Sequence, residues 1–221
     1  MNLNILSVWD KADEIDRTEG ALAYTRYNTT LHRVAAHYGF AFPNVVAAFC
    51  ALSPNNDYSG NLRSTITLLR ASNEGIPVEK VHVSTYNACR ARAWDFIHGE
   101  DFLTRTKGPK TRNFYQNILD PASADPITID GHMVCVWLGK RMTMVEVAWS
   151  KFKYETVAND FKIVANGLGI LPNQLQSTLW FTWKRINNVV YKPQLGLFQD
   201  PTDTWGLDVQ PGDIRPFFPF L

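Results

Sequence analysis

A chain of 221 residues is long enough for one large domain or for two small lobes. Apolar residues make up 45% of it and charged residues 19%, a balance that buries a hydrophobic core and excludes a disordered or low-complexity protein. The formal net charge is only +1, so overall basicity gives no argument for nucleic acid. Any surface that binds nucleic acid must therefore be local.

The three cysteines, Cys50, Cys89 and Cys135, are far apart and form no C-x-x-C pair, which argues against a zinc or iron–sulfur site. We expect free thiols in a helical core and a reducing, cytoplasmic location. The N-terminus lacks the basic start and apolar stretch of a signal peptide. The sequence contains no run of about 18 apolar residues, so no membrane span is predicted.

The first half of the chain is predicted to be helical. Residues 11–38 carry apolar side chains at helical spacing, with Gly39 as the stop. Pro43 stands at the start of the apolar run 44–52, which is typical of a buried helix opened by proline. Within residues 58–71, the spacing of Leu62, Ile66 and Leu69 places them on one helical face.

Further elements follow from caps and breakers in the sequence. They are a helix from its N-cap Ser84 to about His98 and Gly99, a helix from Gly108-Pro109 through Leu119, an extended stretch 127–129, a helix from its N-cap Asp130 to about Lys140, and helices over roughly 150–167 and 172–188. The proline- and aromatic-rich tail from Tyr191 is expected to wrap the surface as ordered coil. Evidence for strands is thin, so the predicted class is all-α.

The helix expected after Gly108 has features of an anion-binding site. Its first backbone N–H groups are unpaired and point outward, and such a helix start favours a phosphate. Pro109 fits the first helical position, where a missing N–H costs nothing. Lys107, Lys110 and Arg112 add positive charge nearby. A cation is electrostatically disfavoured at the start of a helix, and this position suits Lys110 as an amine nucleophile.

Asp130 supplies the opposite charge about twenty residues later. At a helix N-cap, a carboxylate is stabilised by backbone N–H groups. The helix, loop and short extended piece between them can fold back on one another, so that the side chains of Lys110 and Asp130 could face one cleft. An amine and a carboxylate can together open an N-glycosidic bond, because the carboxylate stabilises the sugar cation while the amine attacks the anomeric carbon.

These segments resemble the helix-hairpin-helix (HhH-GPD) DNA glycosylases, the group of endonuclease III and 8-oxoguanine glycosylase. Members read approximately L-P-G-V-G-x-K-[TV]-A, then about twenty residues, then V-D-x-H. Here the corresponding segments are residues 104–112 and Ile129-Asp130-Gly131-His132. The resemblance places Lys110 on the Schiff-base lysine and Asp130 on the catalytic aspartate. Thr106 stands where the family has the first hairpin glycine, and Arg105 where it has the preceding proline.

A third match lies upstream, in the same chain order. Residues 52–56, Leu-Ser-Pro-Asn-Asn, resemble the family's L-S-x-[QN]-x stretch, which precedes a side chain that fills the hole left by a flipped base; Asn55 is the candidate. The resemblance implies DNA contacts from Asn55, Asn56, Lys107, Gly108, Thr111, Arg112 and His132. The tryptophans Trp137, Trp149, Trp180 and Trp183 either stack on a base or fill the core, and the helical stretches around them favour the core.

The implied fold is a two-lobed, all-α HhH-GPD architecture. One lobe spans residues 46–130, and the other joins residues 1–45 to 131–221. The implied activity is that of a DNA glycosylase with abasic-site lyase capability, which acts in base excision on a base extruded from duplex DNA. The resemblance implies no cofactor and no metal, and DNA rather than a membrane as the partner of a monomer. A cytoplasmic location means the nucleoid if the source is bacterial, or the host cytoplasm if it is viral.

Two other functions stay open. The same fold could transfer a group onto a hypermodified DNA base, as suspected for glycosylase-like proteins of some viruses. It could also serve as a non-catalytic DNA-binding protein, which the loss of glycine at Thr106 mildly favours. The joint presence of Lys110 and Asp130 argues against plain binding, since binding alone does not need them as a pair.

Overall fold

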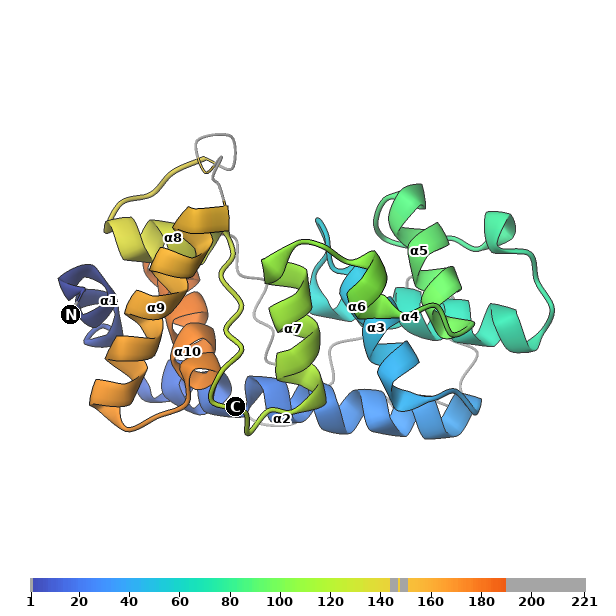
Figure 1. Cartoon of the computed structure of the whole chain (residues 1–221), viewed down its shortest axis with the longest axis horizontal. Helices are drawn as coiled ribbons and strands as arrows, with labels where there is room; N and C mark the ends of the chain where they lie inside the picture. The colour runs from blue at the N-terminus through green and yellow to red at the C-terminus, as the bar shows by residue number, and fades with distance from the viewer. Residues whose placement is uncertain (1, 144–146, 148–150, 190–221) are drawn as a thin grey trace. The chain divides into compact units, whose positions relative to one another are not determined.

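The computed structural model describes residues 2–143, 147 and 151–189, and all regular structure in these ranges is helical. The α-helices are α1 (Leu3–Trp9), α2 (Glu14–Tyr38), α3 (Phe42–Leu52), α4 (Tyr58–Asn73), α5 (Asn87–Ile97), α6 (Phe102–Arg105), α7 (Pro109–Leu119), α8 (Gly131–Leu138), α9 (Lys151–Leu168) and α10 (Pro172–Ile186); a short 3-10 helix covers Val78–Lys80 (Figure 1). The predicted all-α class is therefore confirmed for the described residues.

The chain divides into two compact units. The first unit comprises the described parts of Met1–Asn28 and Asp101–Val190, and the second comprises Thr29–Glu100. This division differs from the expected lobe boundaries at 46 and 130, because residues 101–130 group with the N-terminal segment and not with α3 to α5. One cause is Asn28, whose side-chain amide donates to the carbonyls of Ile118 and Leu119 at 2.8 and 3.2 Å.

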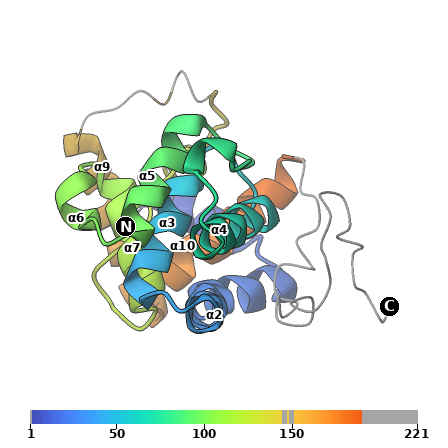
Figure 2. The same cartoon turned by 90° about the vertical axis from the view of Figure 1, so that its right-hand side faces the viewer.

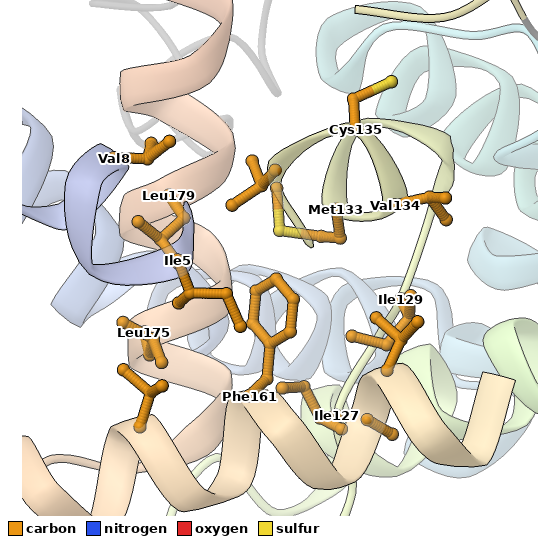
Figure 3. Close-up of a cluster of buried hydrophobic side chains, with 14 of the residues drawn as sticks. Ile5, Val8, Ile127, Ile129, Met133, Val134, Cys135, Phe161, Leu175 and Leu179 are labelled. Atoms are coloured by element: carbon orange, nitrogen blue, oxygen red, sulfur yellow. The ribbon is translucent and has the colours of Figure 1, made fainter. Parts of the chain in front are cut away.

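The core of the first unit is built from α1, α8, α9, α10 and the extended stretch 127–129. Figure 3 shows Phe161 of α9 pointing among the side chains of Ile5 and Met133, and all three are fully buried. Burying such a side chain stabilises the fold by about 1.5–3 kcal/mol. This core holds the start of α8, and with it Asp130, on a fixed frame.

The core of the second unit centres on α3, which lies against both α4 and α5 (Figures 1 and 2). Seven of its eleven residues are buried, which is why its sequence reads as a continuous apolar run. Pro43 lies in its first turn, as predicted. The three cysteines are buried free thiols, which confirms the expectation from their spacing.

Most predicted helix ends are confirmed. The predicted stops Gly39 and Gly99 each have a positive φ just beyond a helix end, where a residue with a Cβ is disfavoured. Gly139, one residue before the expected end of α8, also has a positive φ. The prediction of Ser84 as an N-cap is wrong. Helix α5 begins at Asn87, and the Ser84 hydroxyl lies 2.9 Å from that of Ser64 in α4, so tertiary contact outweighs the local capping tendency.

The expected tail conformation from Tyr191 and the role of Trp149 lie outside the described residues. No single helix among the described residues is long and apolar enough to cross a membrane; one bent pair, α2 with α3, passes on length and composition alone. Within the same ranges, no group of three or more His, Cys, Asp or Glu side chains could hold a metal ion.

Candidate active site in the first unit

Two asparagines of α7 attach the extended stretch 127–129 to this helix. The Asn113 amide donates to the carbonyl of Ile127 at 2.9 Å, and the Asn117 amide donates to the hydroxyl of Thr128 at 3.0 Å. Figure 1 shows the chain after α7 returning beside it toward the end where α7 begins. Lys110 precedes these asparagines by three and seven residues, a spacing that places all three on one face of the helix.

Tyr154 of α9 is the third anchor of this stretch. Its hydroxyl donates to the carbonyl of Ile127 at 2.8 Å and accepts from the backbone N–H of Ile129 at 3.1 Å and from the Asn113 amide at 3.0 Å. Asn113 and Tyr154 together satisfy polar groups of a buried extended segment that pairs with no strand in the described part of the chain. The position of the residue that follows, Asp130, is therefore set by both α7 and α9.

Burial raises the pKa of Tyr154 to about 12. The raised pKa means that the unfolded chain, with a tyrosine pKa near 10, ionises first as the pH rises. Below about pH 10, Tyr154 adds no pH dependence to the free energy of unfolding. Between about pH 10 and 12, its ionisation lowers this free energy by about 2–3 kcal/mol in total. Tyr154→Phe removes this pH dependence. The variant is therefore expected to be less stable than the wild type by an amount that shrinks between about pH 10 and 12, as measured by urea unfolding. A deficit that stays constant from pH 9 to 12 would contradict this assignment.

Asp130 is the N-cap of α8, as predicted. Its backbone is extended, with φ −102° and ψ −177°, and its Oδ1 accepts from the backbone N–H of Met133 at 2.9 Å. The other carboxylate oxygen, Oδ2, accepts from the indole N–H of Trp180 in α10 at 3.1 Å. The carboxylate is half-buried and held from two sides, so its orientation is fixed before any substrate binds.

Lys110 lies in the first turn of α7 and is exposed, as is Lys107 just before this helix. Gly108 occupies the N-cap position, and no side chain caps α7. Gly108 has an ordinary φ of −71°, and a Cβ added to it would meet nothing within 4 Å. The backbone therefore does not require glycine at position 108. Because glycine has no side chain to cap the helix, the start of α7 is open and lies beside two exposed lysines.

Arg112 braces the connection between α6 and α7. Its Nη1 donates to the carbonyl of Leu103 at 3.2 Å and, more weakly, to that of Thr106 at 3.5 Å. Thr106 has an extended backbone with φ −92°, and its N–H closes α6 on the carbonyl of Phe102 at 2.8 Å. Threonine at position 106 thus causes no backbone strain. Thr111 is half-buried, and the DNA contacts expected of Thr111 and Arg112 stay predictions.

The Trp180 indole is surrounded by three side chains. His132 packs against it edge-on with ring centroids 6.4 Å apart, and Phe181 does so at 5.3 Å. The ammonium of Lys184 lies 3.8 Å from the centroid of the indole ring. Trp180 is half-buried, and so is Trp137, whereas Trp183 is buried as expected of a core residue.

Asn55 and Asn56 belong to the second unit and occupy the turn between α3 and α4. Asn55 is exposed and has a φ of +54°, a left-handed conformation that asparagine tolerates better than most residues. Asn56 holds the turn: its amide donates to the carbonyl of Leu52 at 3.2 Å, and its Oδ1 accepts from the Ser84 hydroxyl at 3.0 Å. Asn55 is thus presented to solvent, while Asn56 has a structural role in the turn.

The first unit contains seven of the predicted site residues, namely Lys107, Gly108, Lys110, Thr111, Arg112, Asp130 and His132, and the second unit contains Asn55 and Asn56. Sequence reasoning missed the side chains that fix Asp130 and the stretch before it, namely Asn113, Asn117, Tyr154 and Lys184, and it considered Trp180 only for base stacking or for the core. The helical spacing of Asn113 and Asn117 relative to Lys110 was a usable signal for the first two. Nothing in the sequence pairs Trp180 with Asp130, fifty residues away.

The described residues thus define a helical fold with an exposed lysine at the start of α7 and a capping aspartate at the start of α8. Residues 1–187 match the family described as "Family of unknown function (DUF7178)", and the chain belongs to this family. Neither a curated protein nor a solved structure gave a match.

Proposed function

We propose that this protein is a DNA glycosylase with abasic-site lyase capability and a divergent two-lobed HhH-GPD fold. The observation that carries the proposal is the tethering of residues 127–129 to α7 by Asn113 and Asn117. It puts Lys110 on the helix face that holds the stretch leading into Asp130. The residues that resemble the lysine and the aspartate of the glycosylases therefore belong to one local framework.

The proposed reaction uses an amine and a carboxylate. As the bond between the sugar C1′ and the base nitrogen breaks, the base leaves with the electron pair and positive charge develops on the sugar; the Asp130 carboxylate stabilises this charge. The Lys110 amine attacks C1′ as the base leaves, and its nitrogen then gives up a proton. The C1′–O4′ bond breaks, O4′ takes up a proton, and a protonated imine forms between the Lys110 Nζ and C1′. The exposed lysines at the open start of α7 suit the phosphate backbone, and Asn55 suits the space left by the extruded nucleotide.

Borohydride trapping on duplex DNA with a preformed abasic site tests this proposal. Reduction of the imine is expected to give a covalent protein–DNA adduct that Lys110→Ala abolishes. Lys107→Ala is the matched control, because it removes a neighbouring exposed cation. This control should weaken DNA binding and its salt dependence slightly and keep the adduct.

No adduct with the wild-type protein would overturn Lys110 as a Schiff-base former. Salt-dependent binding of the same DNA without an adduct would then favour a DNA-binding protein. Incorporation of a small amine into DNA that carries a pyrophosphorylated base would instead favour group transfer onto a modified base. An adduct that survives Lys110→Ala would place the nucleophile elsewhere.

A further inference from the structure

Trp180 takes no direct part in the proposed reaction, but its indole N–H donates a hydrogen bond to the carboxylate of Asp130, the proposed catalytic aspartate. A carboxylate at a helix N-cap needs only the backbone N–H groups of the helix to be satisfied, and Met133 supplies one at 2.9 Å. The second donor, at 3.1 Å, fixes the other oxygen and therefore the rotation of the carboxylate about its Cβ–Cγ bond.

The indole is itself held in place. His132 and Phe181 meet it edge-on, and the Lys184 ammonium lies over the ring, 3.8 Å from the centroid. A cation on the ring face draws electron density from the indole and strengthens its N–H as a donor. Lys184 is one helical turn after Trp180 on α10, so the helix fixes their relative position.

We propose that Trp180 is a positioning residue for Asp130, supported by Lys184, and that it acts in the release of the base and not in imine formation by Lys110. This inference rests on the proposed glycosylase function. The geometric reason is that sugar-cation stabilisation depends on where the carboxylate oxygens point. Attack by Lys110 on a preformed abasic site requires no glycosidic bond to break.

Trp180→Phe tests the proposal, because it keeps an aromatic ring and removes the indole N–H donor. The matched control is Trp137→Phe, which removes an equivalent bond in the same unit, from the Trp137 indole N–H to Asp160 at 2.6 Å. The probes are duplex DNA with a single 7-methylguanine, whose cationic base leaves readily, duplex DNA with a single uracil, and the same duplex with an abasic site.

Trp180→Phe is expected to slow single-turnover base release about 10- to 100-fold at saturating enzyme, because a displaced catalytic group costs rates of this order. Trapping on abasic DNA should change less than about two-fold, since it bypasses the step that Asp130 assists. Lys184→Met should slow release in the same direction by a smaller factor, and Trp137→Phe should leave both readouts unchanged.

Base release by Trp180→Phe at the wild-type rate would overturn this inference alone, and so would an equal loss of release and trapping. Absence of wild-type trapping would overturn the proposed function itself. Wild-type trapping without release of either base would overturn excision and with it the role of Trp180.

The hydrogen bond between Trp180 and Asp130 is also measurable without activity: Asp130→Asn should shift the indole N–H resonance of Trp180 and leave that of Trp137 in place. An unmoved Trp180 resonance would contradict the contact.

Discussion

Asp130→Asn is expected to reduce base release on the order of 10³-fold while the protein stays folded. The neutral amide keeps the volume of the side chain but removes the negative charge that the proposed sugar cation requires. Asparagine is a good N-cap, so its Oδ1 can still accept from the backbone N–H of Met133. Its NH₂ group would then face the indole N–H of Trp180, donor against donor, and one hydrogen bond is lost.

The stability cost of this substitution is about 1–2 kcal/mol, because one hydrogen bond to a charged group is lost and the cap is kept. Single-turnover release of 7-methylguanine and urea unfolding measure the two effects separately. Asp160→Asn is the matched control, since Asp160 is also half-buried and accepts from a tryptophan indole in the same unit. The control should show a similar stability loss and wild-type release. Wild-type release by Asp130→Asn would remove Asp130 from the chemistry.

Local patterns predicted the parts of this site that local physics determines. Asp130 follows an extended apolar stretch and precedes a helical run, so its capping role depends on residues within one turn. The start of α7 after Gly108-Pro109 is similarly local. The positions of Lys110 and Asp130 at two helix starts could therefore be predicted from the sequence.

The interactions that bring these positions together join residues far apart in the chain. Tyr154 contacts Ile127 and Ile129 across more than twenty residues, and Trp180 reaches Asp130 across fifty. Periodicity reports which face of a helix is apolar, but not which polar side chain meets which backbone group. The same limit explains the unit boundary, because Asn28 caps the end of α7 from ninety residues away.

Gly20→Ala is expected to be the most destabilising of these substitutions, through the crossing of α2 and α10. A Cβ at Gly20 would lie within 2.4 Å of the backbone N and Cα of Thr178. A side-chain clash can be relieved by a new rotamer, whereas this clash is with backbone atoms, so the two helices must separate. In an unhindered helix the same change would add up to about 1 kcal/mol of stability; here we expect a loss of about 3 kcal/mol.

Gly108→Ala is the matched control for this prediction, because Gly108 has an ordinary φ and an added Cβ would meet nothing within 4 Å. Its free energy of unfolding should stay within about 0.5 kcal/mol of the wild type. Gly20→Ala should also lower the rate of base release, since α10 carries Trp180 and its separation from α2 disturbs the donor that holds Asp130. Urea unfolding and single-turnover release of the two variants decide the matter: equal stability of the two would show that α2 and α10 do not cross in close contact at Gly20.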